Sequence, residues 1–232
     1  MNERRALGFG LSAVLLWSTV ATAFKLTLAE FSPIQMLTIA SIVSSIALIA
    51  VCAFQGKLSQ LSTTFLSNPW YYLLLGLVNP LAYYLILFKA YDLLPASQAQ
   101  AINYSWAITL TLMAAVFLGQ KIRKQDWVAC TFSYAGVVVI ATKGDVLGMQ
   151  FDSPLGVALA LLSTLLWAGY WILNTKNKAD PVIGVLLGFL VALPFAIGLT
   201  IFEGESFSQI MAKGWMVVTC VGLVEMGITF VL

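Results

Sequence analysis

The chain has 232 residues, of which 60% are hydrophobic and 9% are charged, and its mean hydropathy is +0.93. Soluble domains carry about 25% charged residues, so this composition leaves too little polar surface to cover a water-soluble globule and indicates an integral membrane protein. The net charge of +2 comes from basic residues that are scattered or lie at the ends of apolar segments, which gives no reason to expect a nucleic-acid partner.

Eight apolar segments follow one another along the chain, and we expect each to be a membrane-spanning helix. Prolines mark the starts of several segments, and the connections are short and polar, so neighbouring helices are expected to run antiparallel. The predicted spans are residues 7–28, 34–54, 70–91, 96–118, 127–142, 155–173, 181–202 and 215–232.

The segment 96–118 is the clearest of these spans. It contains no charge over about 23 residues, or roughly 34 Å of helix, which is enough to cross a hydrocarbon core of about 30 Å. Its middle holds Asn103 and Trp106, three residues apart and therefore on one helical face. The chain then turns basic at Lys121, Arg123 and Lys124, which marks a cytoplasmic end.

The distribution of basic residues predicts a cytoplasmic N-terminus in the inner (plasma) membrane. With that orientation eight lysines and arginines fall on the inner side and four on the outer side. The inner residues are Arg4, Arg5, Lys57, Lys121, Arg123, Lys124, Lys176 and Lys178, and the outer ones are Lys25, Lys89, Lys143 and Lys213.

An internal repeat relates the first and second parts of the chain. The matching pairs are Leu15-Leu16-Trp17 with Leu165-Leu166-Trp167, Pro33 with Pro181, and Gly76-Leu77-Val78-Asn79 with Gly222-Leu223-Val224-Glu225. A repeat of five spans is odd-numbered, so the second copy must enter the membrane upside down. Inverted repeats with a site at the midplane are a recurrent plan of secondary transporters.

The fold class expected is therefore an all-α transmembrane bundle of two inverted five-helix repeats, the second truncated, with about eight spans present. Residues 1–147 form the first repeat with five spans, and residues 148–232 the incomplete second repeat with three. Because Leu232 aligns with Ile86, we expect the sequence to be a fragment of a ten-span protein; a natural eight-span protein is the alternative.

These features resemble a known family. The repeat plan, the two Leu-Trp pairs and Leu118-Gly119-Gln120-Lys121 look like the EamA branch of the drug/metabolite transporter superfamily. Leu16–Thr19, Asn103–Trp106 and Trp167–Tyr170 are similar to the YddG-type aromatic amino acid exporters. The family often has an acidic residue where this chain has Gln120. The resemblance implies a small-molecule substrate and a transporter in the lipid bilayer, and it leaves a homodimer open.

Polar and aromatic residues near the span centres are the candidate substrate-binding set. Counting from the span ends places Trp17, Asn79, Trp106, Trp167 and Glu225 in a slab of roughly 10 Å at the midplane, and the other candidates are their helical neighbours. The alternative is that they serve helix packing, since buried amides join membrane helices at about 0.6 to 2 kcal/mol each. The candidates are Trp17, Asn79, Tyr83, Asn103, Trp106, Trp167, Tyr170 and Glu225.

Glu225 is the sharpest of these candidates, because inserting a carboxylate at bilayer depth costs about 2.5 kcal/mol or more. It could take up protons or pair with a substrate amine; the alternative is a protonated acid bonded to a neighbouring helix. There is no histidine, and the three cysteines lie in or at the ends of apolar segments, so we expect no metal site, no cofactor and no catalytic residue.

The leading hypothesis is a secondary transporter that exports small metabolites, amino acids in particular, by alternating access. Efflux of a drug or another metabolite is the alternative within transport. A membrane enzyme is disfavoured because Glu225 stands alone, and a non-transporting subunit or inactive fragment is the third class.

Overall fold

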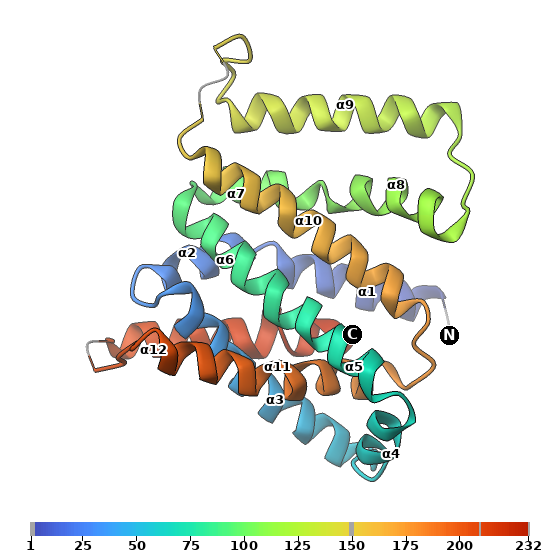
Figure 1. Ribbon diagram of the computed structural model, residues 1–232, viewed down its shortest axis with the longest axis vertical. Coiled ribbons are helices and arrows are strands. Elements are labelled where there is room, and N and C mark those ends of the chain that lie inside the picture. Colours follow the sequence, from blue (N-terminus) through green and yellow to red (C-terminus); the bar gives the residue numbers. More distant parts are fainter. Residues whose placement is uncertain (1–2, 149–150, 209, 232) are drawn as a thin grey trace. The chain divides into compact units, whose positions relative to one another are not determined.

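The computed structural model describes residues 3–148, 151–208 and 210–231, and every regular element within these ranges is a helix (Figure 1). Five helical stretches are long and apolar enough to cross a membrane. They are Pro33–Phe54, Pro69–Leu93, Ala96–Leu118, Pro154–Asn174 and Pro181–Phe202. By length and composition, this confirms an all-helical, multi-pass membrane protein and five of the predicted spans, each bounded within two residues of its predicted ends.

The three other predicted spans are shorter or broken. Residues 7–28 form α1 (Glu3–Trp17) and α2 (Val20–Leu28), which are separated where the hydroxyls of Ser18 and Thr19 donate to the carbonyls of Leu15 and Leu16 at 2.7 and 2.9 Å. Such side-chain bonds compete with the helical ladder, which explains a break inside an apolar run.

The predicted span 127–142 corresponds to α9 (Lys124–Ala141), which begins with three polar residues and ends one residue earlier than predicted. The last predicted span divides into α12 (Ala212–Cys220), the short π-helix η2 (Val221–Glu225) and the short 3₁₀-helix η3 (Ile228–Val231). Residue 232 lies outside the described residues. The count of eight spans therefore stays a prediction.

The chain forms two compact units. Unit 1 comprises residues 1–81 and 178–232, and unit 2 comprises residues 82–177. The division does not coincide with the predicted repeats, which remain a prediction. The two units are described separately below.

The core of unit 1 is the pair α3 (Pro33–Phe54) and α11 (Pro181–Phe202), which pack side by side (Figure 1). The end of α3 lies near the start of α11, so the two helices are antiparallel. Met36 and Leu37 on α3 and Ile183 and Leu186 on α11 are almost completely buried. Thr38 and Thr200 share a hydrogen bond of 2.8 Å between the two helices.

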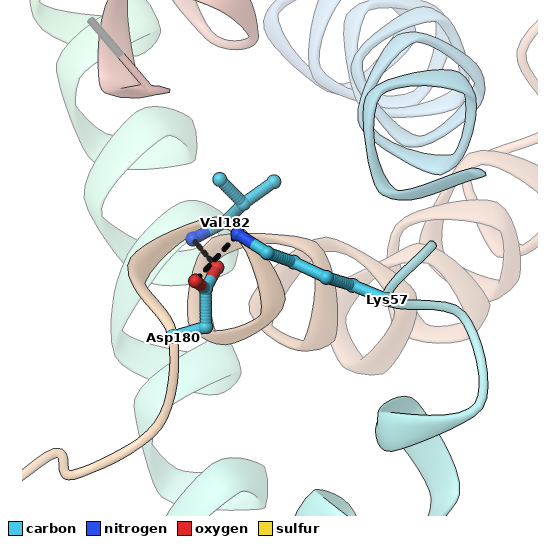
Figure 2. A network of polar contacts seen from close by, with 3 residues as sticks. All are labelled: Lys57, Asp180 and Val182. Carbon is cyan, nitrogen blue, oxygen red and sulfur yellow. Dashed lines mark hydrogen bonds and ion pairs between the residues drawn. The ribbon is translucent and has the colours of Figure 1, made fainter. Parts of the chain in front are cut away.

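The starts of these two helices are capped by their own sequence. Ser32 and Gln35 form a reciprocal capping box before α3. Asp180 caps α11 by accepting from the N–H of Val182 at 3.0 Å, and its second oxygen lies 2.6 Å from Nζ of Lys57 (Figure 2). Each cap stands before a proline, a favoured first helical residue.

Around this pair lie α4 (Gln60–Ser67), α5 (Pro69–Gly76) and α12. The span that begins with α5 is interrupted at η1 (Leu77–Ala82), where Asn79 has an extended backbone (φ −141°, ψ 120°) and Pro80 follows. Proline lacks an N–H and clashes with the preceding turn, which explains the kink.

In unit 2, α10 (Pro154–Asn174) packs against α6 (Tyr83–Leu93), α7 (Ala96–Tyr104) and α8 (Trp106–Leu118) (Figure 1). The helices α7 and α8 are separated only at Ser105, so the predicted span 96–118 is continuous in direction but locally broken. Gly119 ends α8 in the left-handed conformation (φ 68°), which favours glycine.

Candidate functional site

Five of the eight candidate residues lie in unit 2, where Trp167 is the centre of an aromatic cluster. Trp167 stacks on Tyr83, with ring centroids 4.5 Å apart and planes inclined by 29°. Trp106 meets it edge-on at 6.2 Å, and Tyr170 stacks at 5.7 Å. We call these four residues the Trp167 cluster.

The Trp167 cluster is assembled from three helices. Trp167 and Tyr170 share one face of α10 because they are three residues apart, while Tyr83 begins α6 and Trp106 begins α8. Trp167, Tyr170 and Tyr83 are buried, and Trp106 is half-buried. The cluster combines stacked and edge-on aromatic rings with the hydroxyls of two tyrosines, so it joins apolar ring faces with two polar groups.

The side-chain amide of Asn103 is held by a hydrogen bond to α10, the helix that carries Trp167. Its Nδ2 donates to Oγ of Ser163 at 2.9 Å, and Ser163 in turn donates to the carbonyl of Ala160 at 2.6 Å. Ser163 precedes Trp167 by one turn of α10, so the same helical face carries the amide partner and the central indole.

Two polar contacts were not predicted from the sequence. One is the bond of Asn103 to Ser163, and the other is a group of hydroxyls around Thr109. Thr109 on α8 bonds to Tyr134 of α9 at 2.9 Å and to Thr164 of α10 at 3.1 Å. Serine and threonine are common in membrane helices, so type alone gives no signal. Ser163 could have been identified by its position four residues before Trp167, which places it on the same face of the helix.

The other three candidates lie in unit 1. Trp17 ends α1 at the break before α2 and is half-buried. Asn79 lies in the kink of η1, and Glu225 ends η2; both are buried. Among the described residues, Oδ1 of Asn79 and Oε2 of Glu225 have no hydrogen-bond partner.

Within the described ranges no three residues among histidine, cysteine, aspartate and glutamate gather as a metal site. The expectation of no metal and no cofactor stays a prediction.

The five long apolar helices define a multi-pass membrane protein. Residues 4–142, more than half of the chain, match the EamA-like transporter family, so the chain belongs to that family. Membership of the EamA-like family implies a small-molecule substrate and a location in the lipid bilayer. It confirms the family resemblance that the sequence motifs indicated.

Two known proteins are similar to this chain over nearly its whole length. The chain is 24% identical over 231 residues to a protein named aromatic amino acid exporter YddG from Ancylobacter novellus, covering 99% of this chain and 78% of that protein. It is also similar to a solved crystal structure with a TM-score of 0.70 and 22% identity, over 96% of this chain and 75% of that one. The second likeness concerns the fold alone.

Proposed function

We propose that this protein is a secondary transporter that exports small metabolites, aromatic or other amphipathic amino acids in particular, across the inner membrane. Transport proceeds by alternating access about a midplane site. The five candidates of unit 2, which are Tyr83, Asn103, Trp106, Trp167 and Tyr170, bind the substrate, and the three of unit 1 stay predicted substrate-binding residues. The N-terminus is cytoplasmic, and a homodimer remains part of the proposal.

The Trp167 cluster is the observation that carries the proposed substrate class. Stacked and edge-on aromatic rings each contribute about 0.5–1.5 kcal/mol beyond the area they bury, and an aromatic substrate can join such a cluster by the same geometry. The amide of Asn103 supplies a hydrogen-bonding group for the polar end of the substrate. The name of the relative from Ancylobacter novellus supports the same class.

Matching glycines in unit 1 support the inverted repeat. A Cβ at Gly76 would lie 2.7 Å from the carbonyl oxygen of Gly188 and 2.8 Å from Cβ of Val191 on α11. A Cβ at Gly222 would lie 2.7 Å from both the carbonyl oxygen of Ala40 and Cβ of Val43 on α3.

The contact of Gly76 with α11 and the contact of Gly222 with α3 involve equivalent positions of the two proposed repeats. Gly188 and Val191 follow Pro181 at the same distances along the chain as Ala40 and Val43 follow Pro33. The third span of each copy therefore packs on the second span of the other, as a pseudo-two-fold axis requires. This exchange also explains how residues 1–81 and 178–232 combine in one compact unit.

Contacts at the ends of α3 and α11 follow the same relation. Lys57, after α3, pairs with Asp180 at the start of α11. Ser206, after α11, accepts a hydrogen bond of 2.9 Å from Nε2 of Gln35 in the first turn of α3. We keep residues 1–147 and 148–232 as the two repeats, with five spans in the first and three in the second.

Resistance of cells to toxic amino acid analogues tests the proposed function. Cells that express the chain should grow at higher concentrations of aromatic analogues than cells with an empty vector, with little change for small aliphatic analogues. Trp167→Leu should remove the protection, whereas Trp127→Leu, a change on the exposed surface of α9, should keep it. Equal protection by both variants would contradict a role of the Trp167 cluster in binding.

A further inference from the structure

Three basic side chains follow the end of α8 within four residues of one another. Lys121 and Arg123 lie in the loop between α8 and α9, and Lys124 is the first residue of α9. All three are exposed. The apolar span 96–118 ends just before them, so they lie at the level where a bilayer meets water. We call these three residues the basic cluster.

The charges of the basic cluster are not balanced within the protein. Three ion pairs form among the described residues, and all of them lie elsewhere, at Lys57–Asp180, Lys89–Asp92 and Lys143–Asp152. The next carboxylate along the chain, Asp126, accepts from the backbone N–H of Arg123 at 2.8 Å and so serves the start of α9. Three cations therefore meet one carboxylate, and the excess positive charge is free to attract an anion.

Exposed apolar side chains adjoin the basic cluster on both helices. Val116 and Phe117, in the last turn of α8, are 78% and 65% exposed. Val128 and Phe132, on α9, are 56% and 76% exposed. They follow Lys124 at intervals of four residues and share its helical face. Positive charge at one end and an apolar strip beside it match the two parts of an anionic membrane lipid.

The helix α9 buries little of its own surface. Of its residues, Cys130 and Ala141 are buried. The hydroxyl of Tyr134 joins it to Thr109 of α8 at 2.9 Å. A ligand that contacts both the loop and the outer face of α9 therefore adds to the contacts that hold this helix.

We propose that the basic cluster binds the phosphate of an anionic phospholipid, with an acyl chain lying along Val128 and Phe132. Lysine and arginine bind phosphate through charge-assisted hydrogen bonds, and Arg123 can offer two parallel N–H groups to it. Near an anionic lipid surface each such cation contributes about fivefold in affinity. The lipid balances charges that the chain leaves uncompensated and fastens the loop between α8 and α9 to the membrane surface.

Topology offers another role for these charges, because lysines and arginines at span ends favour the cytoplasmic side. That role requires no bound lipid in the folded protein. Lys176 and Lys178, after α10, provide the comparison. Both are exposed, and neither has an ion-pair partner in the part of the chain that the structure describes. The last turn of α10, residues 171–174, has no exposed side chain, so these lysines lack the adjoining apolar strip.

Lipid binding to the purified full chain in neutral detergent tests the proposal. Native mass spectrometry gives the Kd of the first bound lipid, for phosphatidylglycerol and for phosphatidylcholine with the same acyl chains. Phosphatidylglycerol should bind at least about tenfold more tightly. Arg123→Gln/Lys124→Gln should weaken its binding roughly 10- to 30-fold and leave phosphatidylcholine unchanged.

Lys176→Gln/Lys178→Gln removes the same charge and is the matched control, so it should keep phosphatidylglycerol binding within about twofold of the unchanged protein. The altered side chains of both double variants are exposed, and the Tm in phosphatidylcholine micelles checks that each variant is folded. If Arg123→Gln/Lys124→Gln fails to fold, Lys121→Gln decides the result with an expected loss of about fivefold. Glycerol 3-phosphate carries the phosphate without acyl chains, and an about tenfold excess of it over the lipid should not displace phosphatidylglycerol.

Four outcomes would overturn the proposal. The first is equal affinity of the unchanged protein for the two lipids, and the second is an unchanged Kd for phosphatidylglycerol in Arg123→Gln/Lys124→Gln. The third is equal weakening in both double variants, which would assign the effect to net charge. The fourth is displacement of the lipid by glycerol 3-phosphate, which would indicate a site for a small anion. The assay contains no transported substrate, so its result is independent of the proposed export.

Discussion

The indole of Trp167 on α10 stacks against the phenol of Tyr83 on α6, with 4.5 Å between ring centroids and 29° between ring planes. Both rings are buried, and Trp167 also meets Trp106 and Tyr170. A helix near the start of unit 2 and a helix at its end are thus joined by the residues proposed to bind the substrate.

Replacing Tyr83 tests whether the stack contributes to binding. Tyr83→Leu keeps an apolar side chain but removes the aromatic face, so the KM for an aromatic substrate should rise about 2- to 12-fold, with a smaller change for an aliphatic one. Efflux measured over a range of substrate concentrations gives the KM. Tyr71→Leu, at a span end, is the control, and an equal rise in KM for both variants would contradict the role of Tyr83.

The bond between Asn103 and Ser163 should matter for stability as well as for binding. Ser163→Ala removes the acceptor of the Asn103 amide and leaves a buried donor unpaired, which costs about 1–3 kcal/mol. The Tm should fall by roughly 2–4 °C for each kcal/mol. Ser12→Ala, where an exposed hydroxyl bonds only to the carbonyl of Gly8, should change the Tm little. A similar small change for Ser163→Ala would mean that the amide is held by other contacts.

The two close-packed glycines predict a matched pair of defects. Gly76→Ala and Gly222→Ala each place a Cβ 2.7 Å from a backbone oxygen, so each should destabilise unit 1 by about 1–3 kcal/mol. Gly136→Ala has open space on α9 and should be neutral or slightly stabilising, because alanine favours helix. Chemical denaturation in mixed micelles gives the values. A large difference between the first two variants would speak against equivalent contacts.

The ion pair of Lys57 with Asp180 predicts a pH-dependent contribution to stability. Burial by itself raises the pKa of Asp180, but the hydrogen bond and charge of Lys57 and the N–H groups at the start of α11 outweigh it, so the pKa lies below its usual range. The stabilisation is therefore present above the unfolded pKa of about 3.9 and is lost as the pH falls through the lower folded pKa.

Asp180→Asn keeps an N-cap and removes the charge. It should lower stability by about 1 kcal/mol near neutral pH, since both partners are only partly buried. The difference from the unchanged protein should shrink below about pH 4. The Tm of both proteins at a series of pH values tests this, and a difference that stays constant down to about pH 3 would contradict it.

Much of the helical framework could be predicted from the sequence because its signals are local. Prolines at Pro33, Pro69, Pro154 and Pro181 begin four of the five confirmed spans, and hydrophobic length decides the rest. The breaks were missed. At Ser18, Ser105 and Glu225 the helix is interrupted inside an apolar run, where composition still favours a continuous span.

Part of the candidate site could also be predicted, because some of its signals are local in the sequence. Trp167 and Tyr170 lie on one face of a single helix, which the spacing of the two residues predicts. The motif that resembles the transporter family indicated Trp106 and Asn103. Their partners come from other helices. The pairing of Asn103 with Ser163 depends on how α7 crosses α10, and periodicity within either helix does not carry that information.

Counterflow of an aromatic amino acid in proteoliposomes that hold the purified chain tests whether this protein transports such substrates through the Trp167 cluster. Vesicles loaded with unlabelled phenylalanine should accumulate labelled phenylalanine transiently, and loading with unlabelled glycine should give no accumulation. Trp167→Leu should abolish the effect, and Trp127→Leu should preserve it. If purified, folded protein shows no counterflow with any aromatic amino acid, or if Trp167→Leu supports the same counterflow as the unchanged chain, the account of an exporter built around Trp167 is contradicted.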